Sequence, residues 1–76
     1  MQLEAQELKE KLKKELKEVA KNVTIKDRMK IGLHLDIGID AVNRNLRGEF
    51  ETKIEQAELI LKAAKNIVSK KELQIV

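Results

Sequence analysis

Two segments, one at each end of the chain, carry hydrophobic residues at steps of three and four positions. In the first, over about residues 3–22, the apolar stripe is Leu8, Leu12, Leu16, Val19 and Val23. In the second, over about residues 52–69, the stripe is broader: Ile54, Ala57, Ile60, Leu61, Ala64, Ile67 and Val68. This spacing predicts two amphipathic helices. The tail at residues 70–76 could extend the second helix, fray or form a short strand, and the sequence does not decide among these.

The middle of the chain has a different pattern. From Met29 to Ile39 every odd position is apolar and every even position is charged, histidine or glycine. Such alternation is typical of a half-buried strand, and residues 23–25 could pair with it across residues 26–28. The resulting fold would be α+β, with a central hairpin between two helices. Gly32 and Gly38 weaken a strand interior, however, and a lone hairpin needs more support than two helices readily give.

The alternative divides the middle into two short helices around a tight turn. The first would run from residue 26 to 34 or 35, with Thr24 as its N-cap and Asp27 completing a capping box. Asp36 would occupy the turn, because aspartate tolerates a left-handed backbone. The second would begin near residues 38–40 and end at Gly48. This interpretation accounts for all three glycines, so we predict an all-α, four-helix single domain over residues 1–76.

Composition narrows the class of protein. The 76 residues suit one domain, and Phe50 is the only aromatic residue, which predicts a small aliphatic core. Cysteine is absent, which excludes disulfides and thiolate metal sites. No apolar run approaches the length of a spanning helix, and the first residues lack the layout of a signal peptide. We therefore expect a cytoplasmic protein with no membrane partner.

Catalysis has little support in this sequence. His34 is the only histidine and Ser69 the only serine, and the acidic residues lie scattered along charged helices. The glycines do not form a phosphate-binding loop. We predict no enzyme activity, no catalytic residue, no metal site and no cofactor.

The distribution of charge is more informative than its sum of +3. Lysine and glutamate nearly cancel in both end segments, whereas all arginines and aspartates lie in the middle third. Arginine suits directed hydrogen bonding, so the middle third is the expected functional region. The lysine-rich face of the first helix is interpreted as a solvated surface.

Residues 31–48 resemble the helix-turn-helix motif of phage and plasmid repressors and of the head-pieces of lac-repressor-type regulators. The positions that match the pattern are Ile31, Gly32, Leu35, Ile37, Val42, Leu46 and Gly48. Two positions depart from it. Asp36 replaces the turn glycine, and Asn45 stands where an aliphatic residue is usual, which suggests a rotated or less buried second helix. The resemblance implies a helix-turn-helix over about residues 26–47.

With Val42 and Leu46 buried, the second helix of the motif would present a base-reading face to the DNA major groove. Its residues would be Ile39, Asp40, Asn43, Arg44 and Arg47. Arginine bonds guanine, asparagine bonds adenine, aspartate accepts from cytosine, and isoleucine contacts a thymine methyl. Asp40 could equally serve as a helix cap. The predicted phosphate contacts are Thr24, Lys26, Arg28 and Lys53, with Arg47 at the border.

The resemblance implies a sequence-specific regulator that binds double-stranded DNA, in its simplest form a repressor acting as a homodimer. The dimer interface would use the stripes of the first and last helices or the tail at residues 73–76. Duplex DNA is expected rather than RNA because the chain has no aromatic platform for stacked bases. The alternative is a helical protein–protein interaction module without DNA binding.

Overall fold

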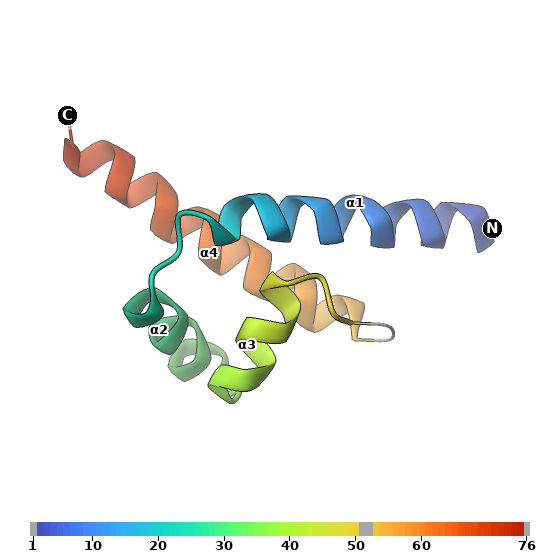
Figure 1. The fold of residues 1–76 in the computed structure, drawn as a ribbon, viewed down its shortest axis with the longest axis horizontal. Helices are drawn as coiled ribbons and strands as arrows, with labels where there is room; N and C mark the ends of the chain where they lie inside the picture. The colour runs from blue at the N-terminus through green and yellow to red at the C-terminus, as the bar shows by residue number, and fades with distance from the viewer. Residues whose placement is uncertain (1, 51–52, 76) are drawn as a thin grey trace.

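The computed structural model describes residues 2–50 and 53–75, with side chains described over residues 6–50 and 53–71. Across these residues the chain forms four α-helices and no strand (Figure 1). They are α1 (Gln2–Ala20), α2 (Ile25–Leu35), α3 (Ile39–Leu46) and α4 (Ile54–Ile75). The all-α prediction is confirmed, and the alternative with a central hairpin is wrong.

The period-two pattern in the middle of the chain has a helical explanation. Ile31 is buried and Leu35 is half-buried on the inner face of α2, whereas Met29 and Leu33 lie exposed on its outer face. The turn then separates these residues from Ile37 and Ile39. Alternate apolar residues therefore belong to different surfaces of two helices.

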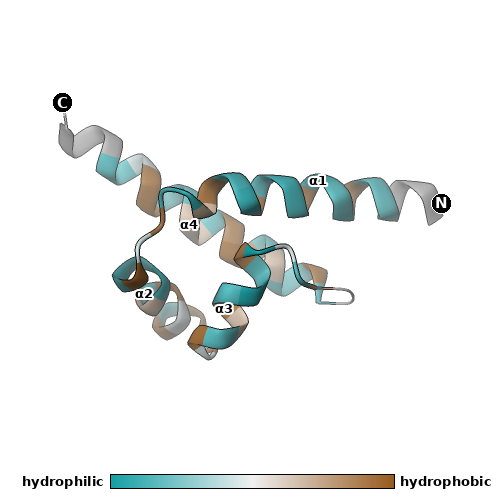
Figure 2. Ribbon diagram, viewed as in Figure 1, coloured by the Kyte–Doolittle hydropathy of each residue, from teal (hydrophilic) through white to brown (hydrophobic). Residues whose placement is uncertain are grey.

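The four helices enclose one core (Figure 2). α1 packs on α4 and α3, while α2 packs on α3 and α4. The buried residues come from all four helices and the segments beside them: Leu12, Leu16, Val23, Ile31, Val42, Leu46, Phe50, Ala57, Ile60, Leu61 and Ala64. Leu8 belongs to the predicted stripe but is exposed, because the N-terminal part of α1 extends past the body of the domain (Figure 1).

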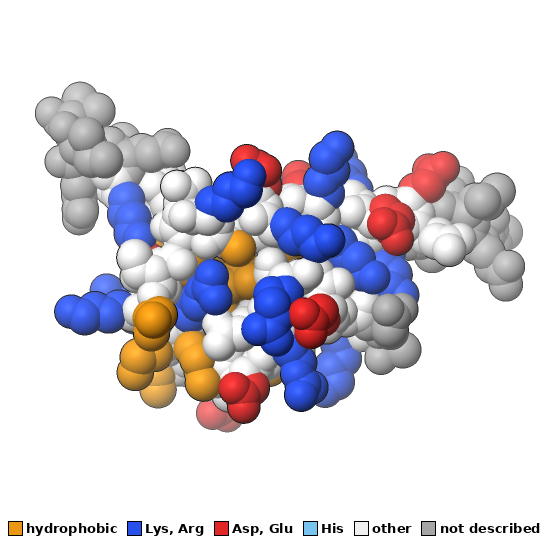
Figure 3. Space-filling model, viewed as in Figure 1, with side chains coloured by type: hydrophobic (Ala, Val, Ile, Leu, Met, Phe, Trp, Pro, Cys, Tyr) orange, Lys and Arg blue, Asp and Glu red, His pale blue; other side chains and the backbone are white. Residues whose placement is uncertain are grey.

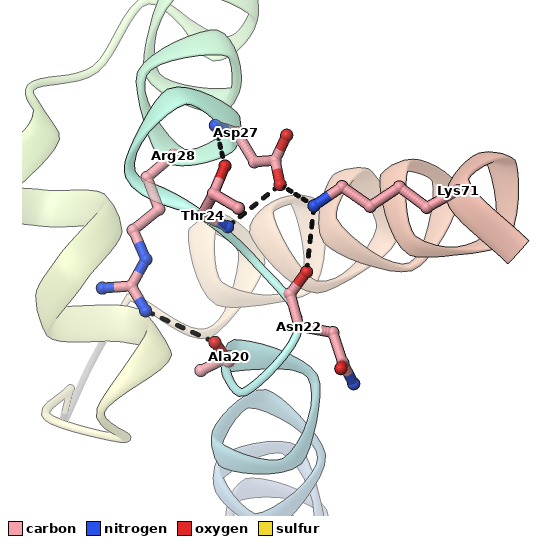
Figure 4. A network of polar contacts seen from close by, with 6 residues as sticks. All are labelled: Ala20, Asn22, Thr24, Asp27, Arg28 and Lys71. Atoms are coloured by element: carbon pink, nitrogen blue, oxygen red, sulfur yellow. Dashed lines mark hydrogen bonds and ion pairs between the residues drawn. The ribbon is translucent and has the colours of Figure 1, made fainter.

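The start of α2 is fixed by a capping box. The Thr24 hydroxyl oxygen accepts from the backbone N–H of Asp27 at 3.1 Å, and the Asp27 carboxylate accepts from the Thr24 N–H at 2.9 Å. Lys71 of α4 donates to the same carboxylate and to the Asn22 carbonyl, 3.2 Å away (Figure 4). The predicted cap is thus confirmed, and it is also tied to the last helix.

The turn between α2 and α3 is left-handed at Asp36, with φ 57° and ψ 49°. The Ile37 N–H donates to the Gly32 carbonyl at 2.9 Å, which closes the end of α2. A Cβ at Gly32 would lie 2.9 Å from the Ile37 carbonyl oxygen. Gly32 therefore permits the tight return of the chain after α2.

The last helix is longer than its apolar pattern predicts. It continues past Ser69 to Ile75, which decides the tail at residues 70–75 in favour of helix. Lys71 explains the extension, because its contacts with Asn22 and Asp27 anchor this part of α4. The predicted start at Thr52 and the end at Val76 lie outside the described residues. None of the helices, over the described residues, is long and apolar enough to cross a membrane.

Candidate nucleic-acid interface

α3 is anchored along one side and exposed along the other. Val42 is 0% exposed and Leu46 1% exposed, so the inner side is fully covered by the core. Asp40, Arg44 and Arg47 are exposed, and Ile39 is partly so. The structure thus brings Asp40, Arg44 and Arg47 to the outer side of one short helix, whereas Asn43, the remaining predicted base-reading residue, is half-buried.

The N-terminus of α3 has no side-chain cap. Gly38 is the N-cap residue, and Asp40 lies in the first turn of the helix. The alternative role of Asp40 as the capping residue is therefore wrong. Its carboxylate still stabilises α3, because a negative charge in the first turn lies near the positive end of the helix dipole.

Asn43 is held by a residue predicted to contact phosphate. The Arg28 Nη1 donates to the Asn43 Oδ1 at 3.0 Å, and Nη2 donates to the Ala20 carbonyl at 3.4 Å (Figure 4 shows the second bond). Arg28 is half-buried, and its Nε is buried without a hydrogen-bond partner among the described residues. Its guanidinium therefore links the end of α1 to α3 and fixes the orientation of the Asn43 amide.

The expectation that Asn45 marks a rotated or less buried end of α3 is wrong. Asn45 is only 4% exposed, so the end of α3 is neither turned outward nor less buried. The Asn45 Nδ2 donates to the Ala41 carbonyl at 2.7 Å and to the Gln56 Oε1 at 3.4 Å. These bonds let a polar residue occupy the position of the usual aliphatic one, while its Oδ1 has no partner among the described residues.

Lysines of α1 border the exposed side of α3. A Cβ built on Gly48 would lie 2.9 Å from the Lys17 Cε and 3.4 Å from the Lys13 Cβ, so both side chains pack against the end of α3. Lys13 also lies over the Phe50 ring, with its Nζ 5.5 Å from the ring centroid. The sequence predicts a solvated face for both lysines. Their contact with the end of α3 could not be predicted, because nothing in their spacing indicates which part of α1 meets α3.

The remaining predicted phosphate contacts divide between two places. Lys53 and Arg44 line one shallow hollow at the end of α3. Thr24 is exposed at the start of α2, where its hydroxyl oxygen accepts within the cap and its hydrogen remains a donor. Lys26 is exposed on the flank of α2 away from Arg28 and Gly32, the residues that contact α3. The structure therefore does not bring Lys26 beside the base-reading face.

The electrostatics of this surface are mixed but mainly basic. Figure 3 shows Lys and Arg side chains over α1 and α3, with acidic side chains among them. The Arg47 Nε is 2.8 Å from the Glu49 Oε2, and both side chains are well exposed. An exposed pair of this kind is weak, so Arg47 can exchange Glu49 for another anion.

No family model, no curated protein and no solved structure matches this chain. The chemistry of the surface must therefore be inferred from its own geometry. Among the described residues, no three histidine, aspartate or glutamate side chains converge in a group that could hold a metal ion. Among the described residues, the outer side of α3 and the lysines beside it form an exposed, mainly basic surface.

Proposed function

We propose that this protein is a sequence-specific regulator that binds double-stranded DNA, in its simplest form a repressor, and that α3 enters the major groove. The observation that carries the proposal is the two-sided character of α3. Its inner side is anchored by Val42 and Leu46, and its outer side presents Arg44 and Arg47, with the half-buried Asn43 at the edge. A helix of this kind fits the major groove and can present hydrogen-bonding side chains to base edges.

Each outward side chain has a distinct role in the proposal. Arg44 is exposed and has the length and geometry to bond guanine through two N–H groups. Asn43 reads a base through an amide that Arg28 orients, which lowers the cost of ordering it on binding. Arg47 contacts a phosphate or base after it leaves Glu49.

Phosphate contacts would come from both sides of α3. Lys17 lies at its C-terminal end, and Lys53 lies beside Arg44. The Thr24 hydroxyl at the start of α2 supplies a neutral donor. Charges of this kind release counterions from DNA, so the affinity should fall steeply as the salt concentration rises.

The experiment is selection of bound sites from a random duplex library, followed by affinity measurements on the selected site at several salt concentrations. We expect Arg44→Ala and Asn43→Ala each to weaken binding by roughly 5- to 150-fold, corresponding to about 1–3 kcal/mol per base contact, and to relax the preference at one base pair. Lys17→Ala should weaken all sequences alike and reduce the salt slope by about one.

Lys62→Ala is the matched control. It removes one positive charge from α4, where the side chain lies in grooves shared with α1 and α2 rather than with α3. Its effect on affinity should be small. If no site is enriched, or if Lys62→Ala weakens binding as much as Arg44→Ala, α3 is not the reading helix and the proposal fails.

A further inference from the structure

The outer face of α2 is apolar and uncovered. Ile25 is 75% exposed, Met29 54% and Leu33 83%. These residues are four positions apart, so they form one stripe along the helix. Figure 3 shows hydrophobic side chains gathered at this end of the molecule. A contiguous apolar patch on a small domain marks an interaction surface more often than scattered exposed residues do.

The helix stripes that the sequence suggested as dimer interfaces pack within the domain instead. The predicted stripes of α1 and α4 are buried in the shared core or packed against it, except for Leu8. Leu8 lines a groove with charged residues of α1 and α4, among them Lys11, Glu15 and Glu58. The side chains of the suggested tail lie outside the described residues. The stripe on α2 thus holds three of the six exposed large hydrophobic residues among the described side chains.

Charge along α2 indicates what covers the stripe. Lys26 lies beside its N-terminal end and Asp36 at its C-terminal end, and both are exposed. Neither has a described ion pair. Lys30, one turn further along α2, is also exposed, so the N-terminal half of this surface is basic and its C-terminal end is acidic. Such a surface complements itself when a second copy is turned through half a rotation.

We propose that the stripe of Ile25, Met29 and Leu33 docks onto the same stripe of a second copy, with the two α2 helices antiparallel. In this arrangement Met29 packs against the partner's Leu33, and Lys26 faces the partner's Asp36. Antiparallel helices also place opposite ends of their dipoles together. Lys26, which lies away from α3, then serves the protein interface rather than a phosphate.

The proposal is independent of DNA binding but has a consequence for it. Arg28 and Gly32 place α3 against one flank of α2. The two-fold axis that relates two antiparallel helices is perpendicular both to the helix axes and to the line that joins the helices. It therefore points out of the pair along the flank of each helix. Both copies of α3 therefore lie on the same side of the pair, where one DNA duplex can meet both.

The small size of the stripe predicts weak association. Three side chains on a single helix cover less than the ~800 Å² per partner of a standard interface. The pair should therefore form at high concentration and dissociate on dilution. Sedimentation velocity without DNA, from about 10 μM to 1 mM protein, tests this expectation.

We expect a concentration-dependent monomer–dimer equilibrium for the wild type and at least a tenfold weaker one for Leu33→Lys. Leu33 is exposed and lysine favours helix, so the fold should survive the substitution, which circular dichroism verifies. Leu59→Lys is the control, because Leu59 is an exposed leucine on α4. A monomer at every concentration, or equal loss in both variants, overturns the proposal.

The antiparallel register has its own test. Lys26→Glu should weaken association because it places two acids together, and this loss should be smaller in an Asp36→Asn background. Asparagine is chosen because it tolerates the left-handed backbone at this position. An equal loss in both backgrounds would show that Lys26 does not face the partner's Asp36 and would overturn the antiparallel pairing.

Discussion

The contact between Asp27 and Lys71 joins the start of α2 to α4, and its contribution to stability can be measured directly. Asp27→Asn keeps the size of the side chain and an oxygen that can accept from the Thr24 N–H, but it removes the charge that faces Lys71. Hydrogen bonds to charged groups contribute about 1.5–3 kcal/mol and neutral ones about 0.5–1.5 kcal/mol. Because the Lys71 side chain is 38% exposed, solvent screening reduces the difference. We expect a loss of about 1 kcal/mol at pH 7.

The pH dependence separates charge from shape. Burial raises the pKa of Asp27, but hydrogen bonds from Lys71 and Thr24 outweigh this effect and hold the pKa below its ordinary value of 3.8. The carboxylate therefore contributes its full stability above pH 3.8, and this contribution is lost as the pH falls through the lower pKa of the folded state. The difference between wild type and Asp27→Asn should be constant from pH 7 to 5 and shrink as the pH approaches 3.

The assay is urea unfolding followed by far-ultraviolet circular dichroism, repeated across this pH range. A loss of about 1 kcal/mol would also lower the midpoint of thermal unfolding by about 4–8 °C for a domain of this size. Glu18→Gln is the control, because its pair with Lys21 is well exposed and should contribute little. A difference that persists unchanged at pH 2.5, or no difference at pH 7, would refute the role of the charge.

Three further substitutions test the local geometry of the motif by urea unfolding. Gly38→Ser should stabilise the protein by about 0.5–1 kcal/mol, because a serine cap adds a few tenths over glycine, the backbone at this position suits any residue, and a Cβ there meets nothing within 4 Å; a loss would show that the backbone there resists a side chain. Gly32→Ala should cost about 1–3 kcal/mol, since its Cβ meets the Ile37 carbonyl oxygen, and an unchanged midpoint would mean that the turn adjusts freely. Leu46→Ala should cost about 2–5 kcal/mol from a residue that is 1% exposed, and a smaller loss would contradict its place in the core.

Features set by neighbouring residues could be predicted from the sequence. The Thr24 cap and the left-handed Asp36 depend on backbone chemistry within a few positions. The burial of Val42 and Leu46 follows from their four-residue spacing. Together these features predicted two short helices around a tight turn and the exposed side of α3.

Features set by distant partners could not be predicted. Lys71 extends α4 through contacts with Asn22 and Asp27, and Asp27 is 44 residues earlier in the chain. Arg28 appears in the sequence as a surface cation, yet its partners on α1 and α3 turn it inward. Asn45 is polar, and its burial depends in part on Gln56 of α4, whose side-chain oxygen accepts a hydrogen bond from the Asn45 Nδ2. In each case the deciding group lies on another turn or helix.

The extension of α1 past the body of the domain has a consequence for hydrogen exchange. Among the described side chains, the first buried residue of this helix is Leu12, so the turns before it gain little from tertiary packing. Their amide hydrogens should exchange by local opening, whereas those near Leu16 should exchange only on global unfolding. Protection along this one helix would then rise from near zero to the full stability of the domain, which makes α1 an internal scale for that stability.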